Sequence, residues 1–410
     1  MRKQARQGAA TKKSMNLEVW RKNQIAVNIS GACHFLGFTL VMPFLPLFVR
    51  QLGVESTAGI AFWTGLILAI SPMIASFAGP LWGRLGDRYG MKLMASRATL
   101  ANCTLLFLMG LSQNVYQLFA LRALMGLLGG FNTVSAALVT QLAPKEKVAK
   151  VIGTLQSIQI LSAAVGPFVG GVLASLIGIR ATFFVTSSVT VVSFLSIILL
   201  YSDSDPKAIA ASRAGAKGER INLLKHPEYL TTMLVLFFIN MADRTFGPIT
   251  PLFLEQLGTP QTRLAVVSGA VISVAAFGEA FSAWLAGRLA SRMSLRRLTM
   301  GRLILSVLVL IPMIFLTSTT QFSVLRVMLA LLAGGTLTLA LTTGSRIIPE
   351  EQRGAGFGML SGTSLLGGAA GPLIAGSLAG FSIRSVFVFN SVVYLLMIGF
   401  VYFNVERNRT

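Results

Sequence analysis

Long apolar runs separated by short polar stretches follow one another along almost the whole chain. The hydrocarbon core of a bilayer is about 30 Å thick, and about 20 apolar residues in helical form cross it. Read at that length, the pattern predicts twelve membrane-spanning helices, at 24–49, 60–82, 93–112, 115–140, 151–177, 181–201, 229–254, 262–288, 298–317, 321–345, 354–379 and 384–404. Alternating segments of about ten residues, typical of membrane-spanning strands, do not occur. The predicted fold class is therefore an all-α polytopic membrane protein.

The longest polar interruption, 202–228, contains Gly, Pro and Ser and separates the sixth apolar run from the seventh. We interpret it as a cytoplasmic linker between two six-helix bundles at 24–201 and 229–404. A basic arm at 1–23 precedes the first bundle, and a short tail at 405–410 follows the second. The arm is longer than the charged region of a cleavable signal, so the first run is expected to stay in the membrane.

The two halves repeat one another at an offset of 204 or 205 residues. Prolines, a glycine-rich basic stretch and single arginines recur at this spacing: Pro43 with Pro248, Pro46 with Pro251, 83–88 with 287–292, Arg122 with Arg326, and Arg180 with Arg384. Because six is an even number, both halves enter the membrane in the same direction. Parallel repeats of this kind predict a substrate site near the midplane, between the halves.

Composition and charge agree with a membrane protein. The chain is 54% hydrophobic and 12% charged, whereas soluble domains carry about 25% charged residues. The formal net charge of +21 comes from short cationic clusters between apolar runs, which argues against binding of nucleic acid. With the N-terminus inside, 28 Lys and Arg fall on the inner side and 4 in the outer loops, so both termini are expected in the cytoplasm. The two cysteines lie inside apolar runs, and no disulfide or metal site is expected.

Three motifs resemble those of the major facilitator superfamily. They are GRLGDRYGMK at 83–92, LRALMGLLGG at 121–130 and SAAVGPFVGGVL at 162–173, and the last resembles the twelve-helix drug:proton antiporter family. The sequence departs from the usual pattern at Met91, normally Arg, and at Ser162, normally Gly. The resemblance extends over the chain from about residue 20. It implies a monomeric transporter of the bacterial inner membrane that exports drug-like amphipathic compounds, uses the proton gradient and needs no cofactor.

The first motif is expected to form a conformational latch. By resemblance, its members are Gly83, Gly86, Asp87, Arg88, Gly90 and Lys92. The glycines allow a tight turn, and the acid can lie against the positive N-terminal end of a neighbouring helix or against an Arg. The second copy of the stretch has Ser291 in place of the acid. The latch is therefore predicted in the first half alone.

The fifth and eleventh spans each contain a proline that is expected to bend the helix. Proline has no N–H to donate and kinks a helix at its position. Small neighbours allow other helices to approach closely at the bend. These residues are Gly166, Pro167, Gly170 and Gly171 in span five, and Gly371 and Pro372 in span eleven. The bend is interpreted either as a rocking element in alternating access or as a fixed bend.

Ionisable residues inside the predicted spans are the candidates for transport and coupling. Charged groups there are costly and usually face a cavity or a partner. The candidates are His34, Arg122, Asp243, Arg244 and Glu279. The family resemblance links Arg122 to proton or substrate handling, and the alternative is that its long side chain snorkels to the surface. Its repeat mate, Arg326, is expected to snorkel.

Asp243 and Glu279 are the candidate proton carriers, with a structural ion pair as the alternative for Asp243 and a cavity position expected for Glu279. His34 is either a proton carrier or a hydrogen-bonded core residue. Many drug:proton antiporters carry an acid in helix 1, and the first span here has none. Coupling through a helix 1 acid is therefore excluded.

No enzymatic function is expected. The chain has no GxxxxGK[ST] phosphate loop, no HExxH and no cysteine cluster. Two alternatives to drug export stay open. One is a specific exporter or importer of a sugar, siderophore or metabolite, and the other is a receptor or scaffold that uses the same fold without transport.

Overall fold

A computed structural model describes residues 2–140, 147–202, 227–290, 292–348 and 353–404. Within these ranges all regular structure is helical. Eight of the described helical stretches are long and apolar enough to cross a membrane. The other four predicted spans correspond to two broken helices, at 115–140 and 227–256, and to two continuous ones, at 295–313 and 353–379. The predicted all-α fold with twelve membrane helices is confirmed.

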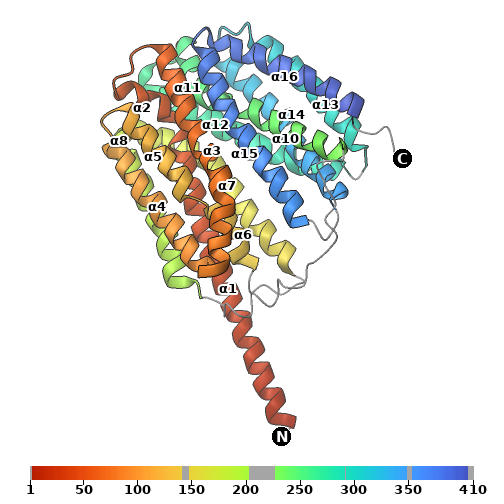
Figure 1. Cartoon of the computed structure of the whole chain (residues 1–410). Helices are drawn as coiled ribbons and strands as arrows, with labels where there is room; N and C mark the ends of the chain where they lie inside the picture. The colour runs from red at the N-terminus through yellow and green to blue at the C-terminus, as the bar shows by residue number, and fades with distance from the viewer. Residues whose placement is uncertain (1, 141–146, 203–226, 291, 349–352, 405–410) are drawn as a thin grey trace.

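The first half contains six spans. Their helices are α1 (Arg2–Leu40) with a 3-10 turn at Met42–Phe44 and α2 (Leu45–Gln51), α3 (Thr57–Tyr89), α4 (Met91–Leu111), α5 (Val115–Leu128) with α6 (Phe131–Thr140), α7 (Val148–Ile177), and α8 (Ile179–Leu195) with a π-helical turn at Ser196–Leu200. The predicted arm continues into the first span, because α1 is helical from Arg2 onward. Figure 1 shows this part of α1 extending away from the bundle.

The second half repeats the arrangement, and Figure 1 shows it in green to blue beside the first. Its helices are α10 (Pro227–Arg244) with α11 (Phe246–Gln256), α12 (Gln261–Leu289), α13 (Leu295–Met313), α14 (Thr319–Ile347), α15 (Arg353–Ala379) and α16 (Ile383–Asn404). The predicted linker at 202–228 and tail at 405–410 lie almost entirely outside the described residues.

The first span of each half is broken at the same position of the repeat. α1 ends at Leu40, and the break between α10 and α11 lies at Thr245, 205 residues later. Pro43 and Pro248 follow these breaks at matching distances. Because proline cannot donate to the carbonyl four residues earlier, each helix loses its regular hydrogen bonding there. The sequence thus places a bend in the two pseudo-equivalent helices 1 and 7.

Single glycines turn the chain between two pairs of helices. Gly90 is the one residue between α3 and α4, and Gly178 is the one residue between α7 and α8. Their φ angles are 97° and 85°, in the region that glycine adopts without a Cβ clash. The tight turn predicted within 83–92 is confirmed at Gly90.

An ion pair joins the two halves at one end of the molecule. The Arg50 guanidinium at the end of α2 donates to both carboxylate oxygens of Glu255 at the end of α11, with N···O distances of 2.9 and 2.7 Å. The two residues occupy the same position in the two repeats. We call this end of the molecule the Arg50 end, and the opposite end, where Gly90 lies, the Gly90 end.

Glycines also bring the two halves into backbone contact toward the Arg50 end. A Cβ added to Gly65 of α3 would collide with the Pro372 carbonyl of α15, and one added to Gly376 would collide with the Ala61 carbonyl. The symmetric crossing joins α7 and α12, where Gly171 packs on the Ala265 carbonyl and Gly269 on the Pro167 carbonyl. Close contact of this kind requires residues without a side chain.

The proline motifs lie at these crossings. Gly166 and Gly170 of α7 pack on α1 of the same half, and Gly371 of α15 packs on the Met241 carbonyl of α10. Next to Pro167, the backbone N–H of Phe168 donates to the Ser273 hydroxyl of α12 at 2.9 Å. Each proline motif therefore contacts its own half and the opposite half. Its role as a rocking element stays a prediction.

Toward the Gly90 end, glycines of the same four helices have open surroundings. A Cβ added to Gly83 of α3, Gly153 of α7, Gly287 of α12 or Gly358 of α15 would meet no atom within 4 Å. The glycine-mediated contacts between the halves, among the described residues, are thus concentrated toward the Arg50 end.

Candidate functional site

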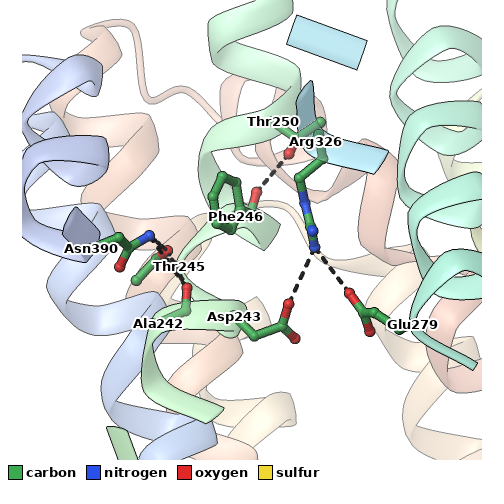
Figure 2. A network of polar contacts seen from close by, with 8 residues as sticks. All are labelled: Ala242, Asp243, Thr245, Phe246, Thr250, Glu279, Arg326 and Asn390. Carbon is green, nitrogen blue, oxygen red and sulfur yellow. Dashed lines mark hydrogen bonds and ion pairs between the residues drawn. The ribbon is translucent and has the colours of Figure 1, made fainter. Parts of the chain in front are cut away.

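Three charged side chains from three helices of the second half meet inside the bundle. Arg326 of α14 uses one nitrogen, Nη2, to contact Asp243 Oδ1 of α10 at 3.2 Å and Glu279 Oε1 of α12 at 3.3 Å. Figure 2 shows the arginine side chain reaching between the two acids. We call these three residues the Arg326 cluster.

The cluster carries an excess of negative charge when both acids are ionised. The Arg326 side chain is 10% exposed, whereas those of Asp243 and Glu279 are 30% and 31% exposed. The guanidinium is therefore the buried member, and the carboxyl groups keep contact with the surroundings. Two carboxylates and one guanidinium leave one uncompensated negative charge, which a single proton can neutralise.

The break in helix 7 positions Asp243. Asn390 of α16 donates from Nδ2 to the Thr245 hydroxyl at 2.8 Å, and that hydroxyl donates to the Ala242 carbonyl at 2.7 Å (Figure 2). These bonds tie the broken end of α10 to α16, one residue from the acid. The Phe246 ring, at the start of α11, lies 4.5 Å from the Arg326 guanidinium carbon, a cation–π contact.

The absence of a side chain at Gly334 allows α14 to approach Glu279 closely. A Cβ added to Gly334 of α14 would lie 2.7 Å from the Glu279 Cα and 2.9 Å from its Cβ. α14 and α12 are therefore in backbone contact at the acid. Arg326 lies about two turns from Gly334 on the same helix, so this contact sets the distance between the arginine and the acid.

The expectation that Arg326 snorkels to the surface is wrong. Arg326 is 8% exposed and is held by the two carboxylates. It lies seven residues after the start of its helix, about 10 Å deep, which is as deep as Arg122 in α5. The structural ion pair weighed for Asp243 is present, and it also includes Glu279. Two intramembrane acids in one half indicate that some partner is needed, but the sequence does not show which cation supplies it.

Arg244 does not join the ion pairs of the cluster. It is exposed, and its Cβ and Cγ lie near Gly371 and Gly368 of α15. Adjacent helical residues point about 100° apart, which explains why Asp243 faces Arg326 while its neighbour faces α15.

Arg122 is buried in the first half, which excludes the snorkelling alternative. It is 2% exposed, and its Nε has no hydrogen-bond partner. The Ser71 hydroxyl of α3 donates to the backbone carbonyl of Arg122 at 2.5 Å. This bond joins α3 to α5 but does not compensate the charge of the guanidinium. The guanidinium carbon lies 5.9 Å from the Phe38 ring.

His34 lies apart from the Arg326 cluster. Its ring packs on Phe131 of α6 with a centroid distance of 4.6 Å, and its Nδ1 is buried without a hydrogen-bond partner. The core hydrogen bond weighed for this histidine is therefore not formed at Nδ1.

The latch motif forms the corner between α3 and α4. Gly86 packs on Met91, the residue that replaces the usual arginine, and the Lys92 ammonium donates to the Tyr201 carbonyl at 2.6 Å. Arg88 is exposed beside Tyr89. The Asp87 side chain and Ser291 lie outside the described residues. The latch itself stays a prediction.

Arg97 and Arg302 are among the 28 cations that the sequence assigns to the inner side, but their side chains bind backbone carbonyls of the bundle. Span four breaks at Gly129 and Gly130, and Arg97 donates to the Gly129 carbonyl at 2.8 Å. Its repeat mate, Arg302, donates to the Leu332 carbonyl of α14 at 2.8 Å. Their offset of 205 residues was the signal that could have revealed a shared structural role.

The sequence profile of the Major Facilitator Superfamily matches residues 27–323 and 232–410. The chain is 34% identical to multidrug resistance protein MdtG of Enterobacter lignolyticus, covering 92% of this chain and 90% of that protein. It is 32% identical to MdtG of Escherichia coli strain 55989, covering 95% and 96%. The family recognised from the motifs is confirmed.

Solved structures of transporters have the same fold. A mutant of the nucleoside transporter NupG aligns with a TM-score of 0.75 at 12% identity, covering 94% of this chain and all of that one. A bacterial homolog of the human lysosomal transporter Spinster, inward-facing and occupied, aligns with a TM-score of 0.75 at 16% identity, covering 92% and 95%.

Proposed function

The chain belongs to the major facilitator superfamily, a family of membrane transporters, and from this premise we propose that it exports drug-like amphipathic compounds in exchange for protons. The proposal places a monomer in the bacterial inner membrane with both termini in the cytoplasm, driven by the proton gradient without a cofactor. Its relatives named multidrug resistance proteins support the substrate class. The distribution of Lys and Arg supports the orientation.

The Arg326 cluster is the observation that carries the proton-coupled mechanism. Two partly exposed carboxyl groups share one buried guanidinium, so a proton taken up from the surroundings converts the cluster from net negative to neutral. Binding of that proton to either acid releases its ion pair and leaves Arg326 paired with the other. The cluster therefore has two states that differ in charge and in the contacts between α10, α12 and α14.

Helix 7 connects this switch to the contact between the halves. Asp243 lies next to the break of helix 7, and Glu255, twelve residues further along, holds Arg50 of the other half. A change of partners at Asp243 can therefore tilt α11 and alter the Arg50–Glu255 pair. In alternating access, the present arrangement corresponds to the state in which the Arg50 end is closed.

Reconstituted vesicles with an imposed pH gradient test the proposed function. The protein is inserted into liposomes, and movement of several fluorescent amphipathic drugs is followed with and without the gradient. We expect transport that requires the gradient and stops when a protonophore collapses it. Absence of gradient-dependent movement for every drug tested would contradict the proposal.

A further inference from the structure

Arg122 is a buried cation without a counterion in the part of the chain that the structure describes. It is 2% exposed, its Nε has no hydrogen-bond partner, and no described carboxylate forms an ion pair with it. The sequence supplies no acid at this depth, because the six predicted spans of the first half contain no Asp or Glu. An uncompensated charge inside a membrane protein is costly, so a partner from outside the chain is expected.

The internal repeat shows which counterions are missing. Arg122 corresponds to Arg326, which is held by Asp243 and Glu279. The position of Asp243 is occupied in the first half by Phe38, 205 residues earlier, and that of Glu279 by Ala75, 204 residues earlier. The Phe38 ring lies 5.9 Å from the Arg122 guanidinium carbon, in the place of a carboxylate. The first half therefore has the arginine but apolar residues at the positions of both acids.

We propose that Arg122 binds an anionic group of the transported compound, an assignment that rests on the proposed function. A guanidinium presents a planar fork of N–H donors that matches the oxygens of a carboxylate, sulfonate or phosphate. The substrate supplies the charge that the first half lacks, and its release on the far side leaves the arginine unpaired again. The preferred substrate class is thus an amphipathic anion.

Aromatic groups nearby suit the apolar part of such a compound. His34 lies one helical turn from Phe38 on α1, on the same face of the helix. Its ring packs on Phe131 of α6. Nδ1 of His34 is buried without a hydrogen-bond partner, so it lacks a polar contact of the kind that a ligand atom can supply. A charged head at Arg122 and an apolar body along Phe38 and Phe131 is the arrangement that this half favours.

Equilibrium binding to the purified full-length protein tests the assignment without a proton gradient, so it can fail independently of the proposed function. The probes are 11-(dansylamino)undecanoic acid and its uncharged methyl ester, which share one fluorophore. We expect Arg122→Gln to lower the acid-to-ester affinity ratio about tenfold, and Arg122→Lys to lower it less. Arg263→Gln, at an exposed arginine in the first turn of α12, is expected to leave the ratio unchanged.

A second variant keeps Arg122 in place and therefore guards against misfolding. Phe38→Asp supplies the internal counterion present in the second half and is expected to lower the acid-to-ester affinity ratio, whereas loss of the ring weakens binding of both probes alike. Phe38→Asn introduces a side chain of the same size as Asp but without its charge. It is the matched control and should retain the preference for the acid. An acid-to-ester affinity ratio that stays at the wild-type value in both Arg122→Gln and Phe38→Asp would overturn the assignment. A second combination of results would also overturn it. In that case chloride stabilises the wild type but not Arg122→Gln, and the wild type binds the acid no more tightly than the ester.

Discussion

At the scale of residues, one guanidinium nitrogen serves two carboxylates in the Arg326 cluster. Its contacts of 3.2 and 3.3 Å are longer than the roughly 2.7–2.9 Å of tight charge-assisted hydrogen bonds. The Arg50–Glu255 pair, in contrast, uses two nitrogens at 2.9 and 2.7 Å. Loose sharing suits a group that has to change partners, whereas the bidentate pair suits a contact that holds two domains together.

Arg326→Gln removes the cation and leaves two carboxylates facing each other. At pH 8 we expect the melting temperature of the detergent-purified protein to fall by about 5 °C, because both buried ion pairs are lost. Glu279→Gln added to the same chain should restore part of the loss, because only one carboxylate then remains without its cation. The exposed Arg263→Gln serves as the control. Equal melting temperatures of wild type and Arg326→Gln at pH 8 would contradict this role.

The two acids of the site could be predicted from the sequence, but their partner could not. Asp243 and Glu279 stand out because carboxyl groups are rare inside apolar runs. Arg326 lies near the predicted start of its span, where a long side chain usually reaches the surface. Which neighbour an arginine faces depends on how α10, α12 and α14 pack, and a single hydrophobic pattern does not contain that information.

At the scale of elements, three of the helices that carry candidate functional residues are broken. Helices 1 and 7 break next to matching prolines, and helix 4 breaks at Gly130, whose φ is 101°. The apolar pattern predicts these segments as continuous spans, because hydropathy reports the length of a run but not its hydrogen bonding. Gly129 and Gly130, at the end of the LRALMGLLGG motif, lie at this interruption of the helix.

The corner between α3 and α4 leads to a prediction on the latch. Gly90 turns the chain, and Lys92 ties the start of α4 to the Tyr201 carbonyl, so the preceding turn of α3 has a fixed direction. Asp87→Asn keeps the size of the side chain and removes its charge. We expect this change to slow drug transport about tenfold, since the acid can no longer hold a helix N-terminus or an arginine.

Ser291→Ala is the matched control for the latch, because Ser291 occupies the same place in the second repeat. It is expected to transport at close to the wild-type rate in the same vesicle assay. Matching losses from both substitutions would show that the two corners have equal roles, which contradicts a latch restricted to the first half.

At the scale of the whole molecule, the two halves are joined at the Arg50 end by an ion pair, a hydrogen bond and two glycine crossings. The crossings pair α3 with α15 and α7 with α12, which are equivalent pairs in the repeat. Opening this end requires these contacts to separate together. The sequence predicts two parallel halves with a site between them. Which end of the molecule is closed follows only from the contacts in the structure.

Charge exchange at the Arg50 end tests whether the ion pair holds it closed. Spin labels at positions 55 and 263, in a chain with Cys33 and Cys103 replaced, report the distance between the halves. Arg50→Glu should shift the distribution to longer distances, because two acids then face each other. The exchanged variant Arg50→Glu with Glu255→Arg should return the distribution toward that of the wild type. Identical distributions in all three proteins would mean that the pair does not control closure.

Drug efflux from everted membrane vesicles tests the central claim, proton coupling through the Arg326 cluster, most directly. The variants are Glu279→Gln and Asp243→Asn, with Glu55→Gln, at an exposed acid, as the matched control. We predict that at least one of the two cluster variants binds the drug but loses the dependence of its transport on the pH gradient, because a neutral amide cannot take up and release the proton. The control is expected to behave like the wild type. Gradient-dependent efflux at wild-type rates in both cluster variants would contradict the account.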